Sequence, residues 1–272
     1  MKFEGGGAKL ITDKSKFYDS KFYHAMNKHG FGDMWEAYEV TTLDGYILTT
    51  FHVPAQTATS KGSVLVQHGH TQDGSSWIES YGDEMPPQLQ LAYHGYDVWI
   101  GNNRGTEYSQ RHLTYESAGA SAKDFWDFSW ADMAYDDVAN IAGIKSVTGE
   151  DKITYLGYSQ GTIQMHYALA HDEDLWFQDN LKRVIQLAPC FVAEIPGLNK
   201  SEYDASLANF RENGIYAING PDWEKDLAKI CELYDELTCY LYSNDLGYGQ
   251  PRPVKADEYW AQNFFMNSFN EW

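Results

Sequence analysis

One short stretch constrains the fold more than any other part of the chain. Residues 152–162 read Lys-Ile-Thr-Tyr-Leu-Gly-Tyr-Ser-Gln-Gly-Thr, and a helical pattern follows as far as position 171. β-branched and aromatic residues before a G-x-S-x-G pattern predict a strand, a sharp turn and a helix, which together hold a serine hydroxyl at the end of a sheet. An ordinary serine in a glycine-bounded turn fits the same five residues. Ser159 is therefore a candidate nucleophile that the rest of the chain must support.

The charge of the chain limits its partners. Lys and Arg number 20 and Asp and Glu number 39, so the formal net charge is −19 at pH 7. Such a chain is repelled by nucleic acid and by anionic membranes, and we expect neither as a partner. A neutral lipid surface is not excluded, because it attracts through apolar contact.

Targeting signals are absent from the pattern of the sequence. No apolar run has the length that spans a bilayer, and residues 1–7 lack the apolar stretch of a signal peptide. This favours a protein that stays inside the cell, or else a mature or engineered start.

The three cysteines are too few for a disulfide framework. Cys231 and Cys239 would lie about 12 Å apart along one unbroken helix, whereas a disulfide needs Cα atoms within about 7 Å. A bridge between them requires a helix break near Asp235. Two separate buried thiols are the alternative, and Cys190 stands alone.

Alternating and apolar runs predict further strands on both sides of the hairpin turn Leu43-Asp44-Gly45 and beyond it. These strands are expected at residues 36–42, 46–53, 63–68, 96–101 and 183–188. A helical pattern covers 123–145 and ends at Thr148-Gly149. Strands that alternate with helices predict an α/β fold, with a mostly parallel sheet and helices on both faces.

Differences in residue pattern divide the chain into three parts. Residues 1–34 show no clean period and are expected to form a loosely packed N-terminal arm with one short helix. Residues 35–193 hold the α/β core. Residues 194–272 contain short helical patterns broken by Gly and Pro, which predicts a helical cap over the catalytic end of the sheet. We expect most cap aromatics to pack its own core, with an apolar acyl pocket as the alternative.

The apolar run 63–68 leads directly into Gly69-His70. In a sheet of this kind, the loop after such a strand supplies one main-chain N–H to an oxyanion hole, and the residue after the nucleophile supplies the other. The expected donors are the main-chain amides of His70 and Gln160. One donor of this type lowers the barrier by roughly 3–4 kcal/mol.

Six blocks of the chain, in this order, resemble the acid lipase family, the gastric and lysosomal acid lipases of the α/β-hydrolase fold. The blocks are Tyr38-Glu39-Val40 with Asp44-Gly45-Tyr46-Ile47-Leu48, Gln67-His68-Gly69, Gly95-Tyr96-Asp97-Val98-Trp99 with Gly101-Asn102 and Arg104-Gly105, Phe125-Trp126-Asp127-Phe128-Ser129, Gly157-Tyr158-Ser159-Gln160-Gly161-Thr162, and Leu187-Ala188-Pro189. The resemblance covers residues 30–195 and continues weakly to the end.

The resemblance implies an esterase or lipase that acts on neutral lipid esters without a metal or cofactor. It carries Ser159 over as the nucleophile, with Gln160 and residue 70 as oxyanion donors. His70 departs from the apolar residue that is usual there. A main-chain donor does not depend on its side chain, but a histidine changes the polarity of the pocket. The family implies a secreted or lysosomal location, which conflicts with the missing signal peptide, so the compartment is unknown.

A hydrolase of this fold needs a catalytic acid and then a histidine after its serine. All nine histidines lie at or before position 171. His166 would lie about 10 Å along the helix axis from Ser159, out of hydrogen-bond reach. His68 and His70 precede the serine and are the two candidates for a substitute base. The acid and base are therefore unknown; Glu194 stands where some hydrolases place the acid.

We expect the family's last two core strands, which deliver the acid and the histidine, to have no counterpart in these residues. Three hypotheses follow. The chain is the amino-terminal part of an acid-lipase-like hydrolase that a second polypeptide completes. Alternatively, it is a catalytically inactive lipase-like subunit with a structural or binding role in an assembly. In the third hypothesis it is a truncated lipase sequence.

Overall fold

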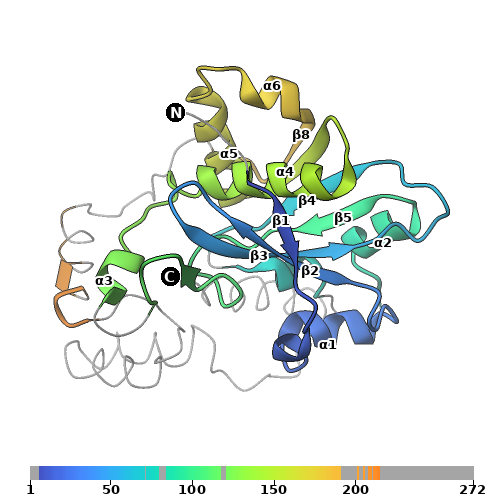
Figure 1. Cartoon of the computed structure of the whole chain (residues 1–272), viewed down its shortest axis with the longest axis horizontal. Helices are drawn as coiled ribbons and strands as arrows, with labels where there is room; N and C mark the ends of the chain where they lie inside the picture. Colours follow the sequence, from blue (N-terminus) through green and yellow to red (C-terminus); the bar gives the residue numbers. More distant parts are fainter. Residues whose placement is uncertain are drawn as a thin grey trace.

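The computed structural model describes residues 6–70, 72–79, 84–117 and 121–190, together with residues 201, 205, 208–209 and 211–214. The predicted cap at 194–272, the pair Cys231 and Cys239, and Glu194 lie outside the described residues or almost entirely so. Within the described part, eight strands form one sheet (Figure 1).

One half of the sheet is antiparallel. The strands β1 (Ala8–Leu10), β2 (Glu36–Thr41) and β3 (Tyr46–Val53) pair antiparallel in this order, and β3 pairs antiparallel with β5 (Asp97–Ile100). The two-residue strand β6 (Arg111–His112) also pairs with β3.

The other half is parallel and carries the predicted turn at Ser159. Here β5 neighbours β4 (Ser63–Gln67), β4 neighbours β7 (Ile153–Tyr158), and β7 neighbours β8 (Leu181–Leu187). Within the described residues β8 ends the strand order, and its Ile185 and Leu187 are partly exposed. The predicted α/β-hydrolase-like fold is confirmed.

Two apolar cores lie on opposite faces of the parallel strands. Val64 and Val66 of β4 pack into the core that holds α1 (Lys21–Lys28) and α2 (Pro87–Tyr93). Leu65, between them, packs into the core that holds α4 (Ala134–Thr148), α5 (Gln160–Ala170) and α6 (Trp176–Asn180). Alternate residues of a strand point to opposite faces, so β4 is covered by helices on both sides, as predicted.

The prediction of one helix over 123–145 is wrong. The chain forms the short helix α3 (Ala122–Phe125), leaves the helical conformation, and begins α4 at Ala134. Between them Asp132 accepts hydrogen bonds from the main-chain N–H and the hydroxyl of Ser129, at 2.8 and 2.9 Å. Local side-chain bonds of this kind compete with a continuous helix. The predicted end is right, because Gly149 caps α4 with φ 72°.

The expectation of a loosely packed arm is also wrong. The arm contributes β1, a 3-10 turn η1 (Ser15–Phe17) and α1. Phe17, Phe22 and Met26 are buried in the same core as Phe51 of β3, and Phe22 stacks on Phe51 with a centroid distance of 3.8 Å. These aromatics were visible in the sequence, but their partners are far along the chain.

A further 3-10 turn, η2 (Gly74–Trp77), follows the loop after β4. In the part of the chain that the structure describes, no helix combines the length and the apolar character that a membrane span requires.

Candidate active site

Ser159 lies at the junction of β7 and α5. Its backbone has φ 47° and ψ −113°, a conformation that costs on the order of 1–3 kcal/mol. Neighbouring backbone holds it there: the Ser159 N–H donates to the Leu187 carbonyl at 3.0 Å, and the Thr162 N–H donates to the Ser159 carbonyl at 2.9 Å. This strained strand-to-helix turn is the geometry of a nucleophile elbow.

The two glycines of the pattern are required by close backbone contacts. A Cβ atom at Gly157 would lie 2.7 Å from the carbonyl oxygen of Gly161. A Cβ atom at Gly161 would lie 2.6 Å from the carbonyl oxygen of Gln67 and 2.9 Å from that of His68. Backbone oxygens cannot rotate away as side chains can, so any larger residue forces β4, β7 and α5 apart.

The loop after β4 lies against the elbow. A Cβ atom at Gly69 would be 3.1 Å from the Cβ of Ser159. The side chains of the two predicted oxyanion donors also meet, because His70 Nδ1 donates to Gln160 Oε1 at 2.9 Å. The proton is assigned to His70 because a carbonyl oxygen only accepts. The structure therefore brings His70, Gln160 and Ser159 together, and the role of their main-chain amides stays a prediction.

The hydroxyl of Ser159 has a sulfur neighbour. Its Oγ lies 3.9 Å from Sγ of Cys190, and the Cys190 N–H donates to Thr162 Oγ1 at 2.9 Å. None of the histidines in the described ranges is a hydrogen-bond partner of this hydroxyl. The proton acceptor that a serine nucleophile needs is thus not identified among these residues.

His68 does not serve as that acceptor. It is buried, and the Asn103 N–H donates to its Nε2 at 3.1 Å, so the ring proton sits on Nδ1 and is donated to the Gly69 carbonyl at 2.8 Å. Both ring nitrogens are committed to backbone groups. Burial lowers the pKa of His68 to about 4, so the ring is neutral and supports the loop.

His166 lies within α5, and His171 directly follows its last residue, Ala170. The His166 side chain contacts the side-chain amide of Gln186 on β8. His171 Nδ1 donates to the carbonyl of Tyr167 at 2.8 Å. His70 contacts the side chain of Gln160, which follows Ser159, and desolvation of the His70 ring lowers its pKa.

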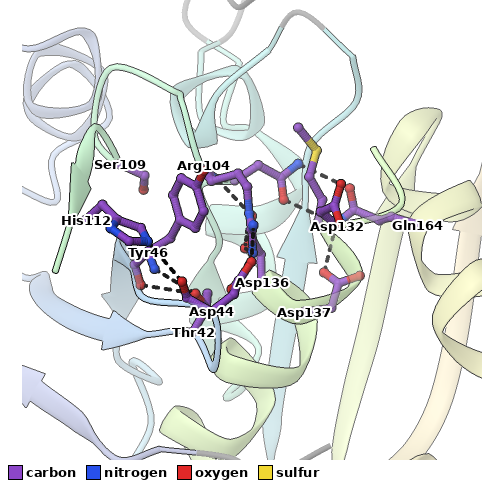
Figure 2. A network of polar contacts seen from close by, with 12 residues as sticks. Thr42, Asp44, Tyr46, Arg104, Ser109, His112, Asp132, Asp136, Asp137 and Gln164 are labelled. Carbon is purple, nitrogen blue, oxygen red and sulfur yellow. Dashed lines mark hydrogen bonds and ion pairs between the residues drawn. The ribbon is translucent and has the colours of Figure 1, made fainter. Parts of the chain in front are cut away.

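Arg104 is the centre of an ion cluster that the sequence did not reveal as a unit (Figure 2). Arg104 is 2% exposed. Its guanidinium binds both oxygens of Asp44 at 2.5 and 3.0 Å and Asp136 at 2.7 and 2.9 Å, while its main-chain N–H donates to Asp136 at 2.8 Å. The ring of Tyr46 lies 4.1 Å from the guanidinium carbon. In the sequence, Asp44, Tyr46 and Arg104 stood out only as members of the blocks that resemble the acid lipases.

These contacts set the ionisation of the two carboxyls. Desolvation raises the pKa of Asp44, but the hydrogen bonds and the charge of Arg104, together with a hydrogen bond from Thr42, lower it by more, so the pKa is lowered. Desolvation also raises the pKa of Asp136, to about 6 despite the attraction of Arg104. The described residues include no group of three or more His, Cys, Asp or Glu side chains arranged to hold a metal ion.

A family model described as the alpha/beta hydrolase fold matches residues 62–229. This range includes β4, the elbow and the strand after it. The chain belongs to the α/β-hydrolase fold family. A second model, described as a partial alpha/beta-hydrolase lipase region, matches residues 24–81, which include the arm helix α1 and the loop that carries His70.

Several lipases are similar to this α/β hydrolase. Lipase lipl-1 of Caenorhabditis elegans is 38% identical over 159 residues, which cover 56% of this chain and 38% of that protein. Lipase member M of Mus musculus is 40% identical over 160 residues, or 57% of this chain and 36% of that protein. Triacylglycerol lipase 2 of Arabidopsis thaliana is 40% identical over 230 residues, or 79% of this chain and 53% of that protein.

Lipases of the lysosomal acid lipase type match the chain at 36–41% identity, which confirms the predicted resemblance to that family. The chain spans only about a third to a half of the length of these relatives.

Proposed function

We propose that the chain supplies the nucleophile and the oxyanion side of a carboxylic ester hydrolase of the lipase type. The observation that carries this proposal is the strained backbone of Ser159 between Gly157 and Gly161. A conformation that costs energy persists only where the surroundings impose it, and such residues cluster at active sites. The names of the lipase relatives point to the same chemistry.

In the proposed reaction, Ser159 Oγ attacks the carbonyl carbon of an ester. The main-chain amides of His70 and Gln160 hold the oxygen that becomes negative. A general base takes the serine proton and returns it to the leaving alcohol. The family order places an acid and then a histidine after the serine, and residues 172–272 contain no histidine. We propose that a polypeptide outside these 272 residues supplies both groups.

Neutral lipid esters are the proposed substrates. A net charge of −19 disfavours anionic substrates and surfaces, whereas an uncharged ester carries no such penalty. The name of one relative, triacylglycerol lipase 2 of Arabidopsis thaliana, agrees with this choice.

Chemical rescue tests the proposal. A serine without its base loses on the order of a million-fold in turnover, so the chain alone should hydrolyse p-nitrophenyl butyrate barely above background. Imidazole added as an external base should accelerate hydrolysis in proportion to its concentration. The variant Ser159→Ala should show no acceleration beyond the imidazole blank. Equal rates for the chain and this variant would overturn the proposal.

A second candidate is a catalytically inactive lipase-like subunit with a structural or binding role. The observation that favours it is the lack of any histidine after position 171. The two candidates differ in the same assay: an inactive subunit has no need of an aligned oxyanion hole, so imidazole should not restore turnover at Ser159.

A further inference from the structure

Asp137 is a buried carboxyl that the proposed reaction does not use. It lies on α4 and has no exposed surface, and neither do its side-chain neighbours Tyr155 of β7 and Gln164 of α5. The Tyr155 hydroxyl lies 3.2 Å from Asp137 Oδ2, and Gln164 Nε2 donates to Asp137 Oδ1 at 3.0 Å. Figure 2 shows the pair Asp137 and Gln164 beside the Arg104 cluster.

Tyr155 has one phenolic proton but two oxygen neighbours, which indicates that Asp137 is protonated. The Tyr155 oxygen lies only 2.6 Å from the carbonyl oxygen of Gly161. A carbonyl oxygen accepts and never donates, so the single phenolic proton belongs to that bond. The contact between Tyr155 and Asp137 then lacks a proton unless Asp137 Oδ2 carries one. The other oxygen of Asp137 accepts from Gln164. With a proton on Oδ2 of Asp137, each of these hydrogen bonds has one donor and one acceptor.

The charges around Asp137 agree with this assignment. The facing ionisable groups are Asp136 on its own helix, whose charge raises the pKa of Asp137, and Tyr155 on β7, which lowers that pKa only where its hydroxyl donates to the carboxylate. The nearby cation, Arg104, is already bound by Asp136 and Asp44. Desolvation is the main reason that the pKa of Asp137 is raised well above its usual value. A buried carboxyl without a cation stays neutral rather than bear the cost of an isolated charge.

The hydrogen-bond network around Asp137 reaches both the loop after β4 and the first turn of α5. Gln164 and Asn103 exchange side-chain hydrogen bonds at 3.2 Å, and the Asn103 N–H supports His68. At the other end Tyr155 holds the Gly161 carbonyl in the first turn of α5, two residues after Ser159. The buried network thus joins the elbow to the loop that carries the predicted oxyanion donor.

We propose that Asp137 is held as a neutral carboxylic acid and acts as a positioning residue for the elbow, donating its proton to Tyr155 so that Tyr155 can fix the Gly161 carbonyl. The catalytic value of this arrangement rests on the proposed function of Ser159. The protonation itself does not, because it follows from contacts that exist whether or not the chain cleaves esters.

An infrared difference spectrum tests the protonation directly. At pH 7 the chain should show the C=O stretch of a protonated carboxylic acid, which Asp137→Asn should remove and the exposed control Asp124→Asn should retain. If the spectra of the wild type and Asp137→Asn show no difference in this band, Asp137 is ionised and the proposal is wrong. This readout does not depend on any activity.

Hydrogen exchange tests the positioning role. An asparagine can replace the neutral acid, since its N–H₂ donates to Tyr155 and its oxygen accepts from Gln164. Amides 160–163 should therefore exchange at the wild-type rate in Asp137→Asn, but roughly tenfold faster in Tyr155→Phe and Asp137→Leu. Equally fast exchange in Asp137→Asn and Tyr155→Phe would refute the role. If Ser159 proves unreactive while these results hold, the proposed function alone fails.

Discussion

A methyl group at position 161 would meet the carbonyl oxygens of Gln67 and His68 at 2.6 and 2.9 Å. Alanine otherwise favours helices over glycine by up to about 1 kcal/mol. Helix propensity alone would therefore make Gly161→Ala stabilising, whereas the clash would make it destabilising. We expect Gly161→Ala to lower the free energy of unfolding by about 1–3 kcal/mol through the clash. Gly7→Ala, whose added Cβ meets only Ser146 Oγ at 3.7 Å, is the matched control. Urea unfolding measures both, and a stabilised Gly161→Ala would contradict the elbow geometry.

The neutral ring of His68 should make the free energy of unfolding depend on pH. Its pKa is about 4 in the folded chain and about 6.5 when unfolded, so the unfolded chain binds more protons in between. The stabilisation is present above pH 6.5 and is lost as the pH falls towards 4. Between pH 7 and pH 4.5 the wild type should lose about 2–3 kcal/mol from this residue.

The variant His68→Gln should lack this part of the acid sensitivity, whereas the exposed control His24→Gln should keep it. Urea unfolding at the two pH values gives the comparison. Identical losses in all three proteins would show that His68 is not the neutral, backbone-bound ring described above.

Among the elements, one side chain ties three strands together. His52 of β3 lies between Glu36 of β2, 2.9 Å from Nδ1, and Asp97 of β5, 3.1 Å from Nε2, and its ring stacks on Trp99 at 3.9 Å. The hydrogen bond from His52 is the main reason that the pKa of Asp97 falls to about 2. This contact lies where the antiparallel half of the sheet meets the parallel half.

The lowered pKa of Asp97 means that its stabilisation is present above pH 3.8 and is lost as the pH falls towards 2. We expect Asp97→Asn to cost about 1–2 kcal/mol at pH 7, allowing for the partial exposure of the carboxyl, and to flatten the loss of stability between pH 4 and pH 2.5. Asp151→Asn on the surface is the control. Thermal unfolding across this range measures both, and an unchanged pH profile for Asp97→Asn would contradict a stabilising contact between His52 and Asp97.

The parallel strands β4, β5 and β7 were predictable because each is a short run rich in apolar, β-branched or aromatic residues. The break between α3 and α4 was not, because it depends on a local bond between Ser129 and Asp132 that competes with a good helical period. The packing of the arm was missed because Phe22 finds Phe51 only in the folded chain. Element type follows local pattern, whereas the partner of a buried side chain is a property of the tertiary fold.

The candidate site likewise contains residues that a local motif predicts and contacts that only the tertiary fold creates. Ser159, Gly157 and Gly161 follow from a motif whose spacing is local. The link from Asp137 to Tyr155 could not be foreseen, since a buried Asp on a helix and a strand Tyr carry no sign of their contact. The His68 ring looked like a substitute base by position, and only its two backbone bonds show that it is structural.

At the scale of the whole molecule, the described residues form an assembled elbow. Ser159, the loop after β4 and the first turn of α5 are brought together by the parallel half of the sheet. The base is not identified among the described residues, and the sequence holds no histidine after position 171. The matched parts make up 38% of lipase lipl-1 and 53% of triacylglycerol lipase 2.

The most direct test is covalent labelling of Ser159 by a fluorophosphonate, located by mass spectrometry of the peptide that contains residues 152–162. We expect slow labelling of the chain alone, a marked acceleration by added imidazole, and no adduct on this peptide in Ser159→Ala. Rapid labelling without imidazole would show that the base already lies within this chain. No adduct at Ser159 even with imidazole would contradict its assignment as the nucleophile.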